Sequence, residues 1–87
     1  MHNAVRYKNC FIDPRVDELR DGSGFTVQIF IAEDRGDETL DHVFHYPADA
    51  RFPTRDAAQA SAIAHGKREI DRGLRADRVI SDVIIPG

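Results

Sequence analysis

Polar and apolar residues alternate through much of the first half of the chain, and a period of two predicts β-strands. The clearest run covers residues 25–33. Every second position in this run is apolar and should face the core: Phe25, Val27, Ile29 and Ile31. Phe30 falls on the opposite face, which is therefore either partly covered or carries an exposed apolar spot of the kind that marks a contact surface.

A second alternating run covers residues 38–46 and follows a short turn in which Gly36 supplies a positive φ. Two strands joined by so short a turn predict a β-hairpin. One face of the second strand holds Leu40, His42, Phe44 and Tyr46, and the other holds Thr39, Asp41, Val43 and His45. Pro47 should end the strand, because proline cannot donate to a strand ladder.

The alternation is less regular near the N-terminus. Residues 4–12 predict a first strand, and counting by two places three large side chains on one of its faces: Val5, Tyr7 and Phe11. Asp13-Pro14 should stop this strand. Residues 15–24 then predict a polar connection that ends in a glycine-rich turn.

The one substantial helix is predicted at residues 54–72. Thr54 suits its N-cap, because the hydroxyl can accept a hydrogen bond from a first-turn N–H, and Gly73 suits the position after its C-terminus. At 100° per residue a thin stripe should face the sheet: Ala60, Ile63, Gly66, Ile70 and Leu74. Gly66 costs a helix interior about 1 kcal/mol relative to Ala, so close packing on the sheet is its expected reason.

Together these elements predict a single α+β domain over residues 1–87, with the first few residues and the tail free to be flexible. The sheet would have three or four mainly antiparallel strands, with the helix of residues 54–72 packed on one face. Residues 79–85 are largely apolar on both faces. They predict either the fourth strand or a segment that docks or swaps onto a partner. The strand segments are then 4–12, 25–33, 38–46 and, in the first alternative, 79–85.

Composition narrows the function classes. The net charge is −3, so the chain lacks the overall positive charge typical of nucleic-acid-binding proteins. Cys10 is the only cysteine, so an intramolecular disulfide and a cysteine-based zinc site are both excluded. The N-terminus has no apolar stretch typical of a signal peptide, which favours the cytoplasm.

No arrangement of catalytic residue types follows from the spacing. His42 and His45 are three apart on one strand, so they point to opposite faces and cannot bind one metal ion. The paired carboxylates fall in loops or at strand ends, outside any predicted cleft. The sequence therefore predicts no enzyme, no metal site and no cofactor.

Basic residues gather at the end of the helix and in the tail. Glu69 and Arg72 can pair within the helix, but Arg68 and Arg72 are like-charged neighbours that such pairing leaves unexplained. The basic edge is thus either an ordinary solvated helix end or a surface that contacts phosphates. With two aromatic residues of the sheet it makes up the predicted interaction surface: Arg68, Arg72, Arg75, Phe30 and Tyr46.

Two resemblances accompany these patterns. The order of strand, hairpin and C-terminal helix resembles the β-β-β-α half of a double-stranded-RNA-binding domain, although TRDAAQ at the start of this helix lacks that family's lysines. Residues 25–73 are more similar to short uncharacterised bacterial stand-alone domains. The shared parts are an aromatic-Pro segment, a Thr-capped Ala-rich helix and a Gly-Lys-Arg-x-Ile-Asp ending, here Phe52-Pro53-Thr54, residues 57–64 and residues 66–71. This resemblance implies a fold and no biochemical role.

The sequence thus predicts a small soluble bacterial protein that is a non-catalytic binding module, a monomer or a weak homodimer with an unknown protein partner. Recognition would use the second sheet face or an edge strand. The first alternative is weak nucleic-acid binding through the basic helix end and tail. The second is an accessory subunit whose enzyme site is completed only in an oligomer.

Overall fold

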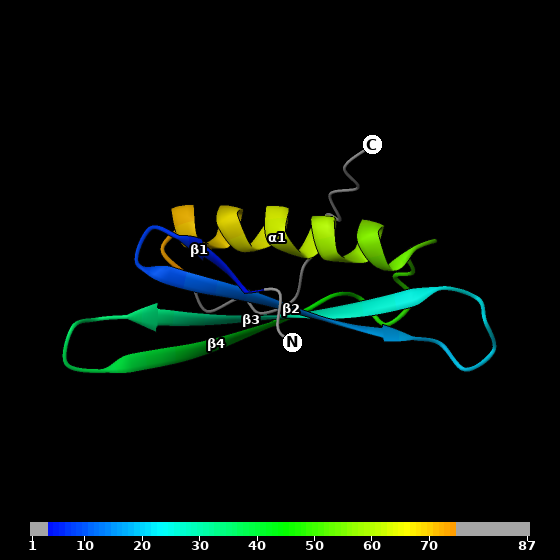
Figure 1. Cartoon of the computed structure of the whole chain (residues 1–87), viewed down its shortest axis with the longest axis horizontal. Coiled ribbons are helices and arrows are strands. Elements are labelled where there is room, and N and C mark those ends of the chain that lie inside the picture. The colour runs from blue at the N-terminus through cyan, green and yellow to red at the C-terminus, as the bar shows by residue number, and fades with distance from the viewer. Residues whose placement is uncertain (1–3, 75–87) are drawn as a thin grey trace.

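The computed structural model describes residues 4–74, and these form a four-stranded antiparallel sheet with one helix packed against it. The strands lie in chain order across the sheet, and α1 covers one face only (Figure 1). This is the predicted α+β architecture. The elements are β1 (Val5–Tyr7), β2 (Cys10–Glu18), β3 (Phe25–Asp34), β4 (Thr39–His45) and α1 (Arg55–Asp71).

The hairpin of β3 and β4 is confirmed, with strand ends within a residue of those predicted. Its antiparallel register pairs Ile29 with Phe44 and Ile31 with His42. Ile29, Ile31 and Phe44 are buried on this face, and Ile29 and Phe44 are fully inaccessible to solvent. The alternation was reliable here because a period of two assigns each side chain to one face once the strand is recognised.

The prediction for the N-terminal region was wrong. Residues 4–12 are not one strand: the chain turns at Lys8 and Asn9, and β2 starts at Cys10. Lys8 has a φ of 54°, a left-handed value that the period-two count takes no account of. The strand then runs on to Glu18, through the segment predicted to be a polar connection.

Pro14 does not stop β2, because its position in the ladder does not need an N–H. The carbonyl of Asn9 accepts from the N–H of Asp34, so odd-numbered residues of β2 direct their backbone groups towards β3. Pro14 is even-numbered, so its backbone groups point away from β3, to the side of β2 on which β1 lies. Among the described residues, β1 pairs there as far as Val5 opposite Ile12. The N–H that Pro14 lacks would point to that side, so its absence breaks no bond to β3.

The turn at Lys8 also changes which residues share a face. Phe11 pairs with Arg6 and Ala32, while its neighbours Cys10 and Ile12 are buried under α1. Phe11 therefore lies on the face away from the helix, and the prediction that it shares a face with Val5 and Tyr7 was wrong.

The helix begins as predicted. The side-chain oxygen of Thr54 accepts from the N–H of Ala57 at 3.0 Å, which satisfies one donor of the first turn. The predicted stripe is only partly right, since Ala60 is exposed and Ile63 is half-buried. Small and polar residues supply most of the buried face instead: Ala58, Ser61, Ala62, His65, Gly66, Glu69 and Ile70.

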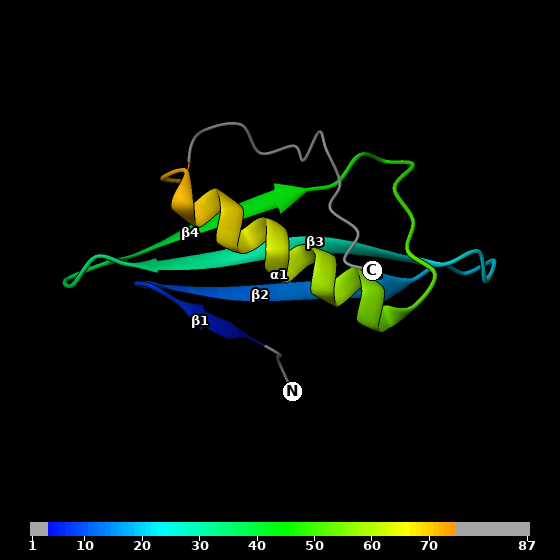
Figure 2. The same ribbon diagram turned by 90° about the horizontal axis from the view of Figure 1, so that it is seen from above.

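Gly66 is the point of closest approach between the helix and the sheet. A Cβ at this position would lie 2.7 Å from Cγ2 of Ile12 and 3.0 Å from its Cδ1. Ile12 is fully buried in β2 and has no room to move away. Seen from above, α1 runs obliquely over β2 and β3 at this short spacing (Figure 2).

The far end of the helix is tied to the turn between β1 and β2. Lys8 Nζ lies 2.6 Å from Oδ1 of Asp71, and the Tyr7 hydroxyl donates to the same carboxylate at 3.1 Å. The hydrogen bond from Lys8 lowers the pKa of Asp71. Residues 79–85, predicted as a strand or a docking segment, lie outside the described part of the chain, as do Arg75 and the rest of the tail.

Gly66→Ala should destabilise the fold by about 1–3 kcal/mol, because the added methyl group overpacks a site that cannot relax. Helix propensity alone predicts the opposite, a gain of about 1 kcal/mol. Ala60→Gly, on the exposed side of α1, is the matched control and should lose about 1 kcal/mol through propensity alone. Urea unfolding of both variants measures the difference. A more stable Gly66→Ala variant would contradict the close packing.

Candidate functional site

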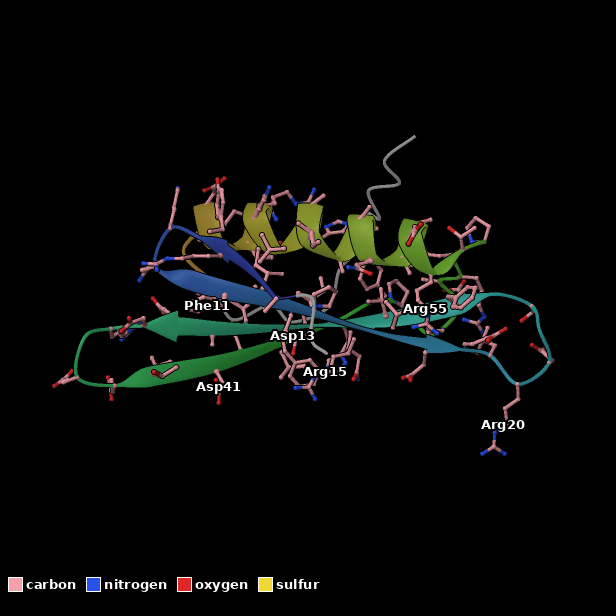
Figure 3. All side chains as sticks on the ribbon, viewed as in Figure 1. Phe11, Asp13, Arg15, Arg20, Asp41 and Arg55 are labelled. Carbon is pink, nitrogen blue, oxygen red and sulfur yellow. The ribbon has the colours of Figure 1, made fainter. Side chains whose placement is uncertain are left out.

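The candidate site is the face of the sheet that points away from α1, called the open face below. No other described element covers it (Figure 1). Side chains of Arg15 and Asp41 project from it on the side opposite the helix (Figure 3). The register of the three long strands assigns its central residues: Phe11, Asp13 and Arg15 from β2, Gln28, Phe30 and Ala32 from β3, and Asp41, Val43 and His45 from β4.

Two phenylalanines form the apolar centre of the open face. Phe11 stands opposite Ala32, and Phe30 stands opposite Asp13, so the two rings occupy diagonal positions on adjacent strands. Phe11 is 44% exposed and is the one large hydrophobic residue classed as exposed within residues 4–74. Phe30 is half-buried. An exposed aromatic side chain beside a second one is the kind of apolar spot that marks a contact surface.

Each phenylalanine carries an arginine over its ring. The guanidinium carbon of Arg15 lies 4.2 Å from the centroid of Phe30, and that of Arg6 lies 5.7 Å from the centroid of Phe11. Asp13 holds Arg15 in place, with its Oδ2 3.2 Å from Nε of the arginine. Arg15 remains about half exposed, so it can offer further N–H donors outward from the sheet.

The open face extends onto the edge strand β4. A shallow depression of about 410 Å³ lies between Arg15 and Phe30 on one side and Asp41 and Val43 on the other. Outside this depression, also on the open face, the side-chain amide of Gln28 lies 3.2 Å from Nδ1 of His45. Asp41 is exposed and has no hydrogen bond or ion pair to any other residue of 4–74.

The predicted interaction residues do not gather at one place. Phe30 lies on the open face, but Tyr46 lies on the helix side. The Tyr46 hydroxyl is 2.9 Å from Oγ of Ser61, and its ring makes edge contacts with Phe52 and His65 at 5.5 and 5.4 Å. Burial raises the pKa of Tyr46 to about 12. Tyr46 therefore packs against the helix side of the sheet and not beside Phe30.

The predicted basic edge is partly neutralised within the helix. Oε2 of Glu69 lies 3.5 Å from Nη1 of Arg72 and 3.9 Å from Nε of Arg68. Arg72 is well exposed, whereas Arg68 is mostly covered. Arg75 lies outside the described residues, so the structure does not place it relative to the other two.

Sequence reasoning missed Phe11, Arg6 and Arg15 as members of one surface. Phe11 was assigned to the opposite face, and Arg15 was assigned to a connection. The polar pair Lys8-Asn9 between two short alternating runs was the available signal, since polar residues that tolerate a left-handed φ mark turns. Recognising that turn would have shifted the count by one and put Phe11 beside Phe30.

A small polar group also lies on the helix side, near the turn between β1 and β2. Nε2 of the mostly covered His42 is 3.1 Å from Oε1 of Glu33, which also lies 3.4 Å from Nε of Arg35. Burial and the neighbouring Glu33 both raise the pKa of Cys10, which is only 1% exposed. A buried thiol held in its neutral form is a poor nucleophile, so this group offers packing and hydrogen bonding.

Within residues 4–74, no three or more His, Cys, Asp or Glu side chains cluster as metal ligands would. The single described helix lacks the length and hydrophobicity needed to cross a membrane.

Comparisons with known proteins assign this chain to no family. No protein-family model matches the sequence, and neither the curated proteins nor the solved structures give a match. The resemblances to bacterial stand-alone domains and to the double-stranded-RNA-binding domain therefore stay predictions.

The position of Tyr46 gives a test at alkaline pH. Its pKa is about 12 in the folded protein and about 10 in an unfolded chain. The unfolded state therefore loses this proton first, and the stability contributed by the neutral phenol should be complete below pH of about 10 and decline towards pH 12. Tyr46→Phe should cost about 1 kcal/mol at neutral pH through the lost hydrogen bond.

The same variant should show a shallower decline in stability above pH of about 10, since it lacks the titrating group. Denaturant unfolding of both proteins at a series of pH values measures this, and other titrating residues cancel in the difference. Identical alkaline profiles would show that Tyr46 is not buried as the structure has it.

Proposed function

We propose that this protein is a non-catalytic binding module and that its open face recognises another protein. The observation that carries the proposal is the Phe11–Phe30 pair, which stays accessible on a face that no described element covers. The proposed recognition works by surface complementarity and includes no catalytic step.

The composition of the open face favours a protein as the partner. Aromatic residues and arginine are enriched where protein interfaces bind most strongly. Arg6 and Arg15 hold their guanidinium groups beside these rings. An arginine preorganised in this way can donate to a partner's carboxylate while the ring beneath it is desolvated.

The charges on this face are mixed, which disfavours a nucleic acid as its ligand. Asp13 and Asp41 lie on the same face as Arg15, whereas nucleic-acid surfaces concentrate positive charge. A protein partner with an apolar patch, a carboxylate for Arg15 and a cation for Asp41 fits the arrangement better.

Nucleic-acid binding through Arg68, Arg72 and Arg75 stays a prediction. Glu69 beside two of these arginines reduces the positive charge available to phosphates. A role as an accessory subunit of an enzyme also stays a prediction, and it would be a special case of the protein binding proposed for the open face.

The open face should contribute little to the stability of the fold. Phe11→Ser should change the free energy of unfolding by less than about 1 kcal/mol, because the ring is half exposed and surface substitutions have small effects. Phe44→Ala, at a fully buried position of the same sheet, should cost about 3–5 kcal/mol. Thermal unfolding of the two variants and the wild-type protein measures these losses of stability. A large loss for Phe11→Ser would mean that Phe11 belongs to the core.

Site-specific crosslinking in cells tests the binding itself. A photo-crosslinking phenylalanine analogue at position 11 should give a discrete crosslinked product with one protein. In a parallel experiment the cells are lysed before irradiation; purified wild-type domain added to this lysate should then reduce the crosslinked product, and the folded variant Phe11→Ser/Arg15→Glu should not. The same analogue at Ala60, on the exposed side of α1, is the positional control.

An equal pattern of products from positions 11 and 60 would contradict the proposal.

The nucleic-acid alternative is tested separately by titrating the protein with a double-stranded oligonucleotide at several salt concentrations. Phosphate contacts predict affinity that falls steeply with salt and that is lost in Arg68→Ala/Arg72→Ala/Arg75→Ala. A flat salt response excludes it.

A further inference from the structure

The outer edge of β4 carries a row of backbone groups that no other described strand uses. β4 is the last strand of the sheet and pairs only with β3 among residues 4–74. The N–H of Arg35 donates to the carbonyl of Glu38, so these two residues form a hydrogen-bonded pair. This pair determines which residues of β4 direct their backbone groups towards β3. Alternate pairs then place the backbone groups of Leu40, His42 and Phe44 towards β3.

It follows that Asp41, Val43 and His45 direct their N–H and C=O groups outward. An edge strand of seven residues with outward-facing groups is a template for pairing with another strand. Their side chains stand on the open face. Along β4 these side chains are a carboxylate, an isopropyl group and an imidazole. A strand that pairs with this edge must present side chains that complement them in this order.

We infer that the edge of β4 binds β4 of a second copy of this chain, antiparallel and centred on Val43. A two-fold axis through that residue places Val43 opposite Val43 of the second copy. It also places Asp41 opposite His45 of the second copy, and the symmetry makes that pair twice. All three residues have outward backbone groups, so about six inter-strand hydrogen bonds can form.

The side-chain donors and acceptors match this register. The side-chain amide of Gln28 can only donate through its nitrogen, so Nδ1 of His45 accepts the bond of 3.2 Å. The remaining ring nitrogen, Nε2, then carries the hydrogen and can donate to the Asp41 carboxylate of the second copy. Asp41 has no competing partner within residues 4–74, and it is exposed.

Shifting the centre to His42 gives a worse match. Outward groups still face each other, but Asp41 then stands opposite Val43 of the second copy, and the carboxylate and the imidazole no longer meet. The complementary pair therefore selects Val43 as the centre. The resulting dimer would have one continuous eight-stranded sheet, with both helices on one side and a single open face on the other.

This inference does not depend on the open face binding a partner, and its tests are different. Val43→Pro removes the central outward N–H and spares the hydrogen bonds between β3 and β4. It should stay folded by circular dichroism and raise the dimer dissociation constant by at least about tenfold, as expected for two lost hydrogen bonds. Thr39→Pro, on the same edge outside the paired segment, should leave dimerisation unchanged. Sedimentation equilibrium measures both.

A charge swap tests the register. His45→Asp sets two carboxylates opposite each other and should weaken the dimer several-fold. Asp41→His/His45→Asp restores a carboxylate opposite an imidazole and should recover wild-type association. Both variants lack the contact between Gln28 and His45, so recovery cannot come from that contact.

A disulfide locates the two-fold axis. Paired residues lie about 5.5 Å apart between Cα atoms, within the range a disulfide spans. Val43→Cys should therefore form a covalent dimer under mild oxidation much faster than Thr39→Cys, and the buried Cys10 should not interfere. The inference is overturned if the full-length chain sediments as a monomer at all concentrations. It is also overturned if Val43→Cys oxidises no faster than Thr39→Cys, as it would if residues 79–85 of the same chain covered β4.

Discussion

The close approach of α1 to β2 at Gly66 is the contact on which the rest of the structure depends. A side chain at this position would collide with Ile12, so the helix can lie this low only where glycine is present. The small residues Ala58, Ser61 and Ala62 of its buried face allow the same short spacing, and His65, Glu69 and Ile70 complete that face. A helix this close shields the middle of the sheet with little apolar volume, and large side chains from the sheet supply the remainder of the core.

That arrangement leaves two surfaces for the proposed binding. One helix covers one face, so the opposite face has no described element over it, and among residues 4–74 the outer edge of β4 pairs with no strand. The open face and the edge meet at Asp41, Val43 and His45, which contribute side chains to the first and backbone groups to the second. A dimer formed at the edge would extend the open face across two copies and present two Phe11–Phe30 pairs to a partner at once, which raises avidity without new contacts.

Much of the fold could be predicted from the sequence because each strong pattern is local. Residues 25–33 and 38–46 alternate cleanly, and Thr54 and Gly73 bracket the helix. The N-terminal hairpin could not be predicted in the same way. A proline breaks a strand only where the ladder needs a backbone N–H at its position. Whether one is needed at Pro14 depends on how far β1 extends. Predicting the candidate site required the turn at Lys8 and Asn9. A shift of one residue in the period-two count moves Phe11 from the helix side of the sheet to the open face. The helix face was misjudged at Ala60 because the large side chain of Ile63 set the predicted stripe, whereas the close approach selects small residues.

Phe11 and the half-buried Phe30 form an accessible surface, whereas Phe44 and Phe52 on the helix side are buried. Solvent paramagnetic relaxation of aromatic ring protons in the full-length protein measures this directly, with a soluble gadolinium chelate as the probe. The structure predicts strong broadening for Phe11, weaker broadening for the half-buried Phe30, and protection for Phe44 and Phe52. Equal protection of Phe11 and Phe44 would contradict it, because the open face would then be covered in the free protein.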